Sequence, residues 1–144
     1  MEIQKNQCIV TYLYNSGFTI QTKNSFIIID YYTSTKNIDL DDYKSKNIYV
    51  LVSHNHGDHY TKRIYDWNEK YNVRYILHDD INAHKDVSPT YVVENRKYNI
   101  DDTLKIETFG STDRGVSFLI HVDEMTLFHS GDLNWWKWKN DSKD

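Results

Sequence analysis

Three histidines and an aspartate fall within six positions of this chain, namely His54, His56, Asp58 and His59. They directly follow residues 48–52, an apolar and largely β-branched run that predicts a buried strand. Neutral imidazole and carboxylate are the ligands that first-row metals take from proteins. We therefore expect His54 and His56 to bind one ion, while Asp58 and His59 face a second.

A glycine inside the same loop, Gly57, would let the backbone fold several side chains back onto one point. The chain has 7 His in 144 residues, and chance would place three of them with an Asp at these offsets about once in a thousand. The alternative interpretation, a solvated polar loop, is therefore disfavoured.

Strand patterns dominate the chain on both sides of this loop. Three short apolar runs separated by turn residues predict an antiparallel meander before it, and Asp30 ends the third run. A charged segment with three apolar residues, 62–70, predicts a short helix, and Asp79 and Asp80 could cap a helical turn over residues 81–84. The predicted strands cover residues 8–14, 18–22, 25–30, 48–52, 74–77, 104–109, 116–122 and 126–130, and Pro89 marks a loop before residues 91–93.

Composition limits the function classes. A length of 144 residues, with 39% hydrophobic and 26% charged residues, predicts one globular domain spanning 1–144. No apolar run approaches the roughly 20 residues of a membrane helix and no secretory signal begins the chain, so we expect a cytoplasmic protein without a membrane partner. The net charge of -4 and the lack of a basic stripe make nucleic acid an unlikely partner. The single cysteine, Cys8, excludes an internal disulfide.

The motif His54-x-His56-x-Asp58-His59 after an apolar strand resembles the signature of the metallo-β-lactamase fold hydrolases. Two further segments support the resemblance, which extends over most of the chain. Residues 26–30 (FIIID) are similar to the strand and aspartate that precede this loop in the family. Residues 127–132 (LFHSGD) are similar to the later strand whose aspartate, here Asp132, bridges the metals.

The resemblance implies an α+β fold of the αββα sandwich type, largely its N-terminal half. It implies a metal-dependent hydrolase with one or two divalent ions held by His54, His56, Asp58, His59 and Asp132, zinc first and manganese or iron as alternatives. Asp58 is the expected catalytic residue, because it would orient or deprotonate the water that attacks an ester, lactone, amide or phosphodiester of a small-molecule substrate. Asp30 is expected to fix the orientation of a ligand imidazole.

The sequence departs from the family pattern at two places. The third histidine of the family follows a glycine in the loop 110–115, and here that position is Ser111. A water, or Asp113, would have to take its place, although Asp113 as a plain turn residue is an equal alternative. The last histidine of the family is also absent before Asp144, so the resemblance implies a domain that is incomplete at its C-terminus.

These departures leave a second hypothesis open, a truncated module of the same fold that binds metal or assembles without catalysis. Trp135, Trp136 and Trp138 would then contact a partner, or else they wall a substrate pocket beside Asp132. A homodimer that covers the missing half is a further expectation.

Overall fold

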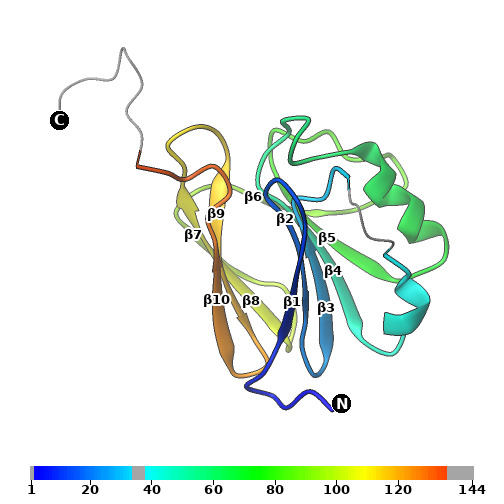
Figure 1. Cartoon of the computed structure of the whole chain (residues 1–144). Helices are drawn as coiled ribbons and strands as arrows, with labels where there is room; N and C mark the ends of the chain where they lie inside the picture. Colours follow the sequence, from blue (N-terminus) through cyan, green and yellow to red (C-terminus); the bar gives the residue numbers. More distant parts are fainter. Residues whose placement is uncertain (1, 34–37, 136–144) are drawn as a thin grey trace.

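Two β-sheets packed face to face form the part of the chain that the structure, a computed structural model, describes, residues 2–33 and 38–135 (Figure 1). Sheet A has the strand order β1-β2-β3-β4-β5-β6 and sheet B the order β10-β9-β8-β7. In sheet A the first three strands form the predicted antiparallel meander, and β3, β4, β5 and β6 run parallel. Sheet B is antiparallel throughout. The strands are β1 (Ile9–Tyr14), β2 (Gly17–Gln21), β3 (Ser25–Ile29), β4 (Asn47–Val52), β5 (Val73–His78), β6 (Thr90–Val92), β7 (Arg96–Asn99), β8 (Leu104–Gly110), β9 (Val116–Val122) and β10 (Met125–His129).

Both faces of the central strands of sheet A are buried, which explains their unbroken apolar sequences. On one face, Ile27 and Leu51 pack against residues of sheet B such as Phe118. On the other face, Ile28 and Val50 belong to a second apolar cluster, which includes buried residues of two 3₁₀-helices. These helices, η1 (Leu40–Tyr43) and η2 (Lys62–Glu69), lie on the side of sheet A away from sheet B (Figure 1).

The predicted αββα sandwich is not confirmed in its helical layers. The two inner sheets are present, but in the described residues only η1 and η2 are helical, and both cover sheet A. The capped helical turn expected at 81–84 is absent, since Asp79 and Asp80 lie in a turn and residues 82–84 are irregular. Within this described part, no helix has both the length and the apolar character to cross a membrane.

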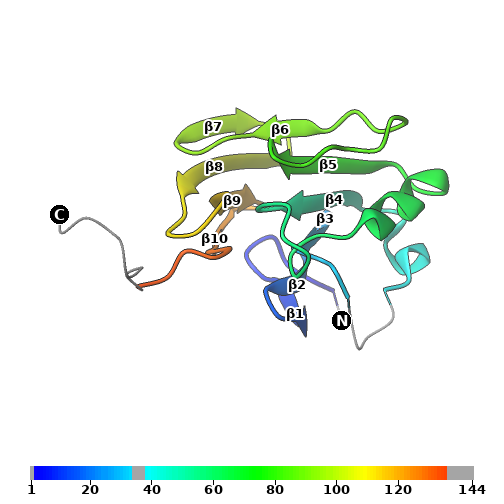
Figure 2. The same cartoon turned by 90° about the horizontal axis from the view of Figure 1, so that it is seen from above.

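Figure 2 shows β7 stacked beside β6 at one edge of the molecule, where the chain passes from sheet A to sheet B. The sequence analysis missed β7 because its four residues, RKYN, are polar apart from one tyrosine. Its pairing with β8 over Arg96–Asn99 comes from tertiary contact rather than from a local apolar pattern.

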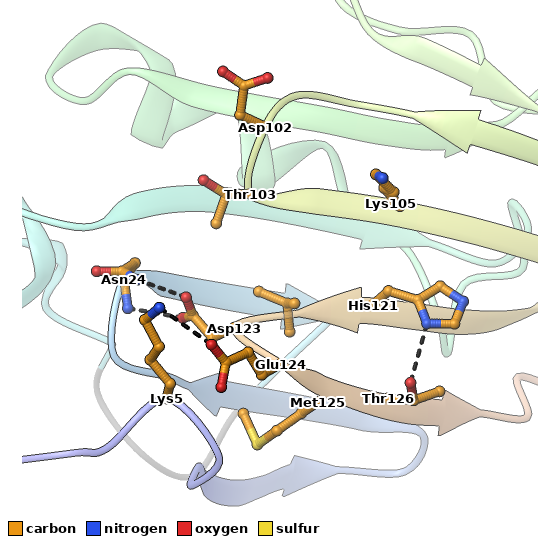
Figure 3. A pocket seen from close by; sticks show the side chains of 11 residues that line it. Lys5, Asn24, Asp102, Thr103, Lys105, His121, Asp123, Glu124, Met125 and Thr126 are labelled. Atoms are coloured by element: carbon orange, nitrogen blue, oxygen red, sulfur yellow. Dashed lines mark hydrogen bonds and ion pairs between the residues drawn. The ribbon is translucent and has the colours of Figure 1, made fainter.

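At one end of the two sheets, Asp123 in the turn between β9 and β10 of sheet B binds the turn between β2 and β3 of sheet A. Its carboxylate accepts hydrogen bonds from Thr22 Oγ1 at 2.5 Å and from the backbone N–H of Asn24 at 2.9 Å. A hollow of about 460 Å³ opens beside it and is lined by residues such as Lys5 and Asp102 (Figure 3). None of the predicted metal ligands lines this hollow, because they follow the opposite ends of the strands.

Candidate metal centre

The candidate site begins where the parallel strands β3 and β4 end side by side. Asp30 directly follows β3, and its backbone N–H donates to the carbonyl of Leu51 in β4 at 2.9 Å. Its φ of +46° lies in the left-handed region, which Asp tolerates better than most residues. This turn directs the Asp30 side chain towards Ser53, whose backbone N–H donates to Asp30 Oδ1 at 2.7 Å.

The buried carboxylate of Asp30 orients two of the predicted ligands. Its Oδ2 accepts hydrogen bonds from His59 Nδ1 at 2.9 Å and from the Ser53 hydroxyl at 2.8 Å. Because the Ser53 hydroxyl donates to Asp30, its oxygen accepts from His54 Nδ1 at 3.0 Å. His129 Nε2 also donates to Asp30 Oδ2, at 2.9 Å. The imidazoles of His54 and His59 are therefore both bound through Nδ1, and each presents its Nε2 on the opposite side of the ring.

These two Nε2 atoms face one carboxylate, that of Asp132. His59 Nε2 lies 3.0 Å from Asp132 Oδ1, and His54 Nε2 lies 3.3 Å from Asp132 Oδ2. The two imidazole rings are close together, with centroids 4.2 Å apart. Both Nε2 atoms are buried, and apart from these contacts with Asp132 neither has a hydrogen-bond partner. Buried polar atoms are nearly always satisfied, so this pair is best explained by a ligand that accepts their lone pairs.

The electrostatics of the three groups differ. Burial would raise the pKa of Asp30, but the hydrogen bonds from His129 and His59 hold it far below its usual range. Burial lowers the pKa of His54, which keeps its ring neutral and able to bind a cation. For His59, burial lowers the pKa, but the bond to Asp30 and the nearby carboxylates outweigh it and the net direction is upwards. A cation at His59 would have to displace its proton.

Four side chains form a cluster with the spacing of a metal site, His54, His56, Asp113 and Asp132. One potential ligand atom from each lies within 4.8 Å of all the others. His56 Nδ1 is 3.7 Å from Asp113 Oδ2, and the rings of His54 and His56 have centroids 4.5 Å apart. The structure thus brings together three predicted ligands and the aspartate that the sequence left undecided.

Asp58 lies next to His59, the imidazole whose Nε2 faces Asp132 Oδ1. Asp58 Oδ2 is 3.7 Å from His59 Nε2, and its side chain is 58% exposed. Asn15, in the turn between β1 and β2, donates its side-chain amide to the carboxylate and to the backbone carbonyl of Asp58, each at 3.2 Å. The two residues expected at a second ion position, Asp58 and His59, are therefore adjacent, but neither belongs to the four-residue cluster.

The loop between β8 and β9 packs closely against the site at Gly115, where the absence of a side chain permits the contact. Its φ is +75°, and a Cβ there would lie 2.0 Å from the Ser53 carbonyl oxygen and 2.6 Å from His54 Cβ. By contrast, Gly57 does not have a positive φ, and a Cβ there would meet nothing within 4 Å. The expectation that Gly57 shapes the loop is therefore wrong, and Gly115 has the sterically restricted position.

We expect Gly115→Ala to lower the free energy of unfolding by about 2 kcal/mol or more, because the methyl group collides with backbone in a strained conformation. The matched control is Gly57→Ala, for which we expect a change within about 0.5 kcal/mol. Urea denaturation of both variants measures the difference. Equal stabilities would show that the loop between β8 and β9 does not pack on Ser53 as described.

Three residues around the site received no role from the sequence analysis, Ser53, His129 and Asn15. Ser53 and His129 hold Asp30, and Asn15 holds Asp58. His129 lies within the segment 127–132 quoted above, and Ser53 directly precedes His54, so their proximity to the predicted ligands in the sequence was the available signal. Trp135, expected either at a pocket wall or in contact with a partner, is fully exposed. Trp136 and Trp138 lie outside the described residues.

Comparison with known proteins assigns most of the chain to one protein family. A family model described as a beta-lactamase superfamily domain matches residues 9–139. No curated protein matches the chain.

Solved structures show the same fold at low sequence identity. A structure assigned as a metal-dependent hydrolase from Parabacteroides distasonis has a TM-score of 0.66 and 18% identity, over 88% of this chain and 61% of that one. Igni18, a metallo hydrolase from Ignicoccus hospitalis, has a TM-score of 0.66 and 20% identity over the same shares. CmlA, a diiron β-hydroxylase from Streptomyces venezuelae, has a TM-score of 0.65 and 11% identity, over 89% of this chain and 30% of that one. The chain therefore spans about three fifths of the first two structures and less than a third of CmlA.

Proposed function

The chain belongs to the beta-lactamase superfamily, and from this premise we propose that it is a metal-dependent hydrolase of a small-molecule ester, lactone, amide or phosphodiester. The proposed ligands are His54, His56, Asp58, His59 and Asp132. The structural neighbours described as metal-dependent hydrolases agree with this proposal, but at 18% and 20% identity they support the fold alone.

The single observation that supports the proposal best is the pair of buried, unbonded Nε2 atoms of His54 and His59 on either side of Asp132. With both rings neutral and no cation bound, the Nε2 lone pairs of His54 and His59 face only the Asp132 carboxylate, which is itself an acceptor, and remain unsatisfied at a cost of about 1–3 kcal/mol each. A divalent cation takes the lone pair of a neutral imidazole and the charge of a carboxylate together. The residues present thus fit one or two ions.

A divalent ion bound by these groups supplies Lewis acidity, which lowers the pKa of a coordinated water towards neutrality. The protein side chains orient the ligands and accept the proton of the attacking water. Asp30 and Ser53 fix the imidazole orientations, so the site is formed before any substrate arrives. Asp58 is the most exposed of the proposed ligands, and Asn15 holds its carboxylate beside His59. We assign Asp58 the role of orienting the attacking water and accepting its proton.

Assay of the purified chain against ester, lactone, amide and phosphodiester substrates tests this function. We expect hydrolysis that a chelator abolishes and that divalent ions restore. Asp58→Asn is expected to lower kcat by a factor of about 10² to 10⁴, because the variant cannot accept a proton. Asp102→Asn, at the opposite end of the sheets, should retain the activity.

Metal binding without hydrolysis across the whole panel would favour the other hypothesis, a non-catalytic module of the same fold. Hydrolysis that persists in Asp58→Asn would refute the role assigned to Asp58.

A further inference from the structure

The loop between β8 and β9 is fixed beside the site from two directions. On one side, the backbone N–H of Val116 donates to the Ser53 carbonyl at 3.1 Å, next to His54. On the other side, Thr112 Oγ1 accepts from the backbone N–H of Asn134 at 2.9 Å, and its hydroxyl can donate to the carbonyl of Asn134 at 3.1 Å or of Asp132 at 3.3 Å. Asp113 lies between these two attachments, so its position relative to His54 and Asp132 is set by the backbone.

The Ser111 side chain does not take the place of a ligand imidazole. Its hydroxyl accepts a hydrogen bond from the backbone N–H of Asp113 at 3.2 Å, within the loop. This contact stabilises the turn that presents Asp113, whose carboxylate lies 3.7 Å from His56 Nδ1. The four-atom cluster includes Asp113 and does not include Ser111. The loop therefore offers a carboxylate where the resemblance leads one to expect a third histidine.

The buried and unbonded Nε2 of His54 is an independent indication that a ligand belongs among these groups. Its side chain is fully buried, whereas the side chains of Asp113 and Asp132 are 29% and 22% exposed. An acidic pair alone would repel across this space. With His54 and His56 it forms a set of two nitrogen and two oxygen donors, in which the two negative charges would balance a dication.

We propose that Asp113 is a ligand of the first metal position and that it shifts the preference of this position from zinc towards manganese(II) or iron(II). The inference rests on the proposed function, in that it takes the cluster to be a metal site. Carboxylates suit harder ions such as manganese, and two histidines with a carboxylate are the set typical of non-haem iron(II) sites. Zinc, the ion expected from the sequence, loses part of its advantage when an imidazole is replaced by a carboxylate.

The test is competition dialysis of the metal-free 144-residue chain against equal concentrations of zinc and manganese(II), followed by elemental analysis. We expect Asp113→His to raise the ratio of bound zinc to bound manganese at least tenfold over wild type. Asp113→Ala should bind both ions at least tenfold more weakly. Asp102→His, an exposed aspartate at the other end of the sheets, controls for an added surface histidine and should leave the ratio unchanged.

A merely structural role for Asp113 predicts another result. The thermal stability of metal-free Asp113→His would fall, but the zinc-to-manganese ratio would not move, and this would overturn the proposal. An unchanged ratio in a protein that still hydrolyses substrate would refute the role of Asp113 alone. Failure of wild type to bind either ion would remove the proposed function as well.

Discussion

Asp132→Ala is expected to reduce kcat/KM by more than about a hundredfold and to remove metal from both positions together. The reason is its central place, since one carboxylate oxygen faces His59 Nε2 at 3.0 Å and the other faces His54 Nε2 at 3.3 Å. Changes to groups that only orient ligands typically cost 10–100-fold, so loss of a shared ligand should cost more. Steady-state kinetics and elemental analysis of the same preparation measure both effects.

The control is Asp102→Ala, which removes a carboxylate far from the site. We expect it to keep the metal content and kcat/KM of wild type. Asp132→Ala must also retain its fold, which far-ultraviolet circular dichroism checks. A folded Asp132→Ala protein with full metal content would contradict the assignment of Asp132 as a bridging ligand.

Asp30→Asn is expected to lower the free energy of unfolding by about 3 kcal/mol, measured with chelator present so that metal binding does not contribute. Asn tolerates the positive φ of this residue, so the backbone is preserved. The variant loses the negative charge on which the Ser53 hydroxyl, His59 Nδ1 and His129 Nε2 converge. Its amide group can accept only some of these donors, and the rest remain buried without a partner.

The pH dependence of stability gives the same prediction an independent check. The pKa of Asp30 is far lower in the folded chain than in the unfolded chain, where it is about 3.9. Its stabilising contribution is therefore fully present above that value and is lost as the pH falls towards the folded value. We expect the unfolding free energy of wild type to fall more steeply between pH 5 and pH 3 than that of Asp30→Asn. Parallel curves, or a destabilisation below about 1 kcal/mol, would show that the Asp30 network contributes little.

The sequence predicted the parts of the fold whose local pattern is strong. The apolar runs predicted eight of the ten described strands to within about two residues, because burial on one or both faces selects apolar residues. The exceptions are β6, which has only three residues, and β7, an exposed edge strand specified by its partner β8. The prediction of helical layers was not confirmed. It came from the family resemblance, and the described residues contain only 3₁₀-helices.

The candidate site was predictable as a set of ligand types but not as a geometry. The spacing of His54, His56, Asp58 and His59 identifies chemistry, whereas the contact of Asp30 with His129 joins residues 99 positions apart. No local pattern reports such a contact. Asp113 shows the same limit, since its place near His56 depends on how the loop between β8 and β9 packs against Ser53.

His54, His56 and Asp132 are expected to share a divalent cation, and anomalous diffraction from crystals grown with manganese or zinc measures this directly. We expect an anomalous peak within roughly 2.0–2.3 Å of a nitrogen of each histidine and of an Asp132 oxygen. A map without a peak there, from crystals saturated with either metal, would contradict it.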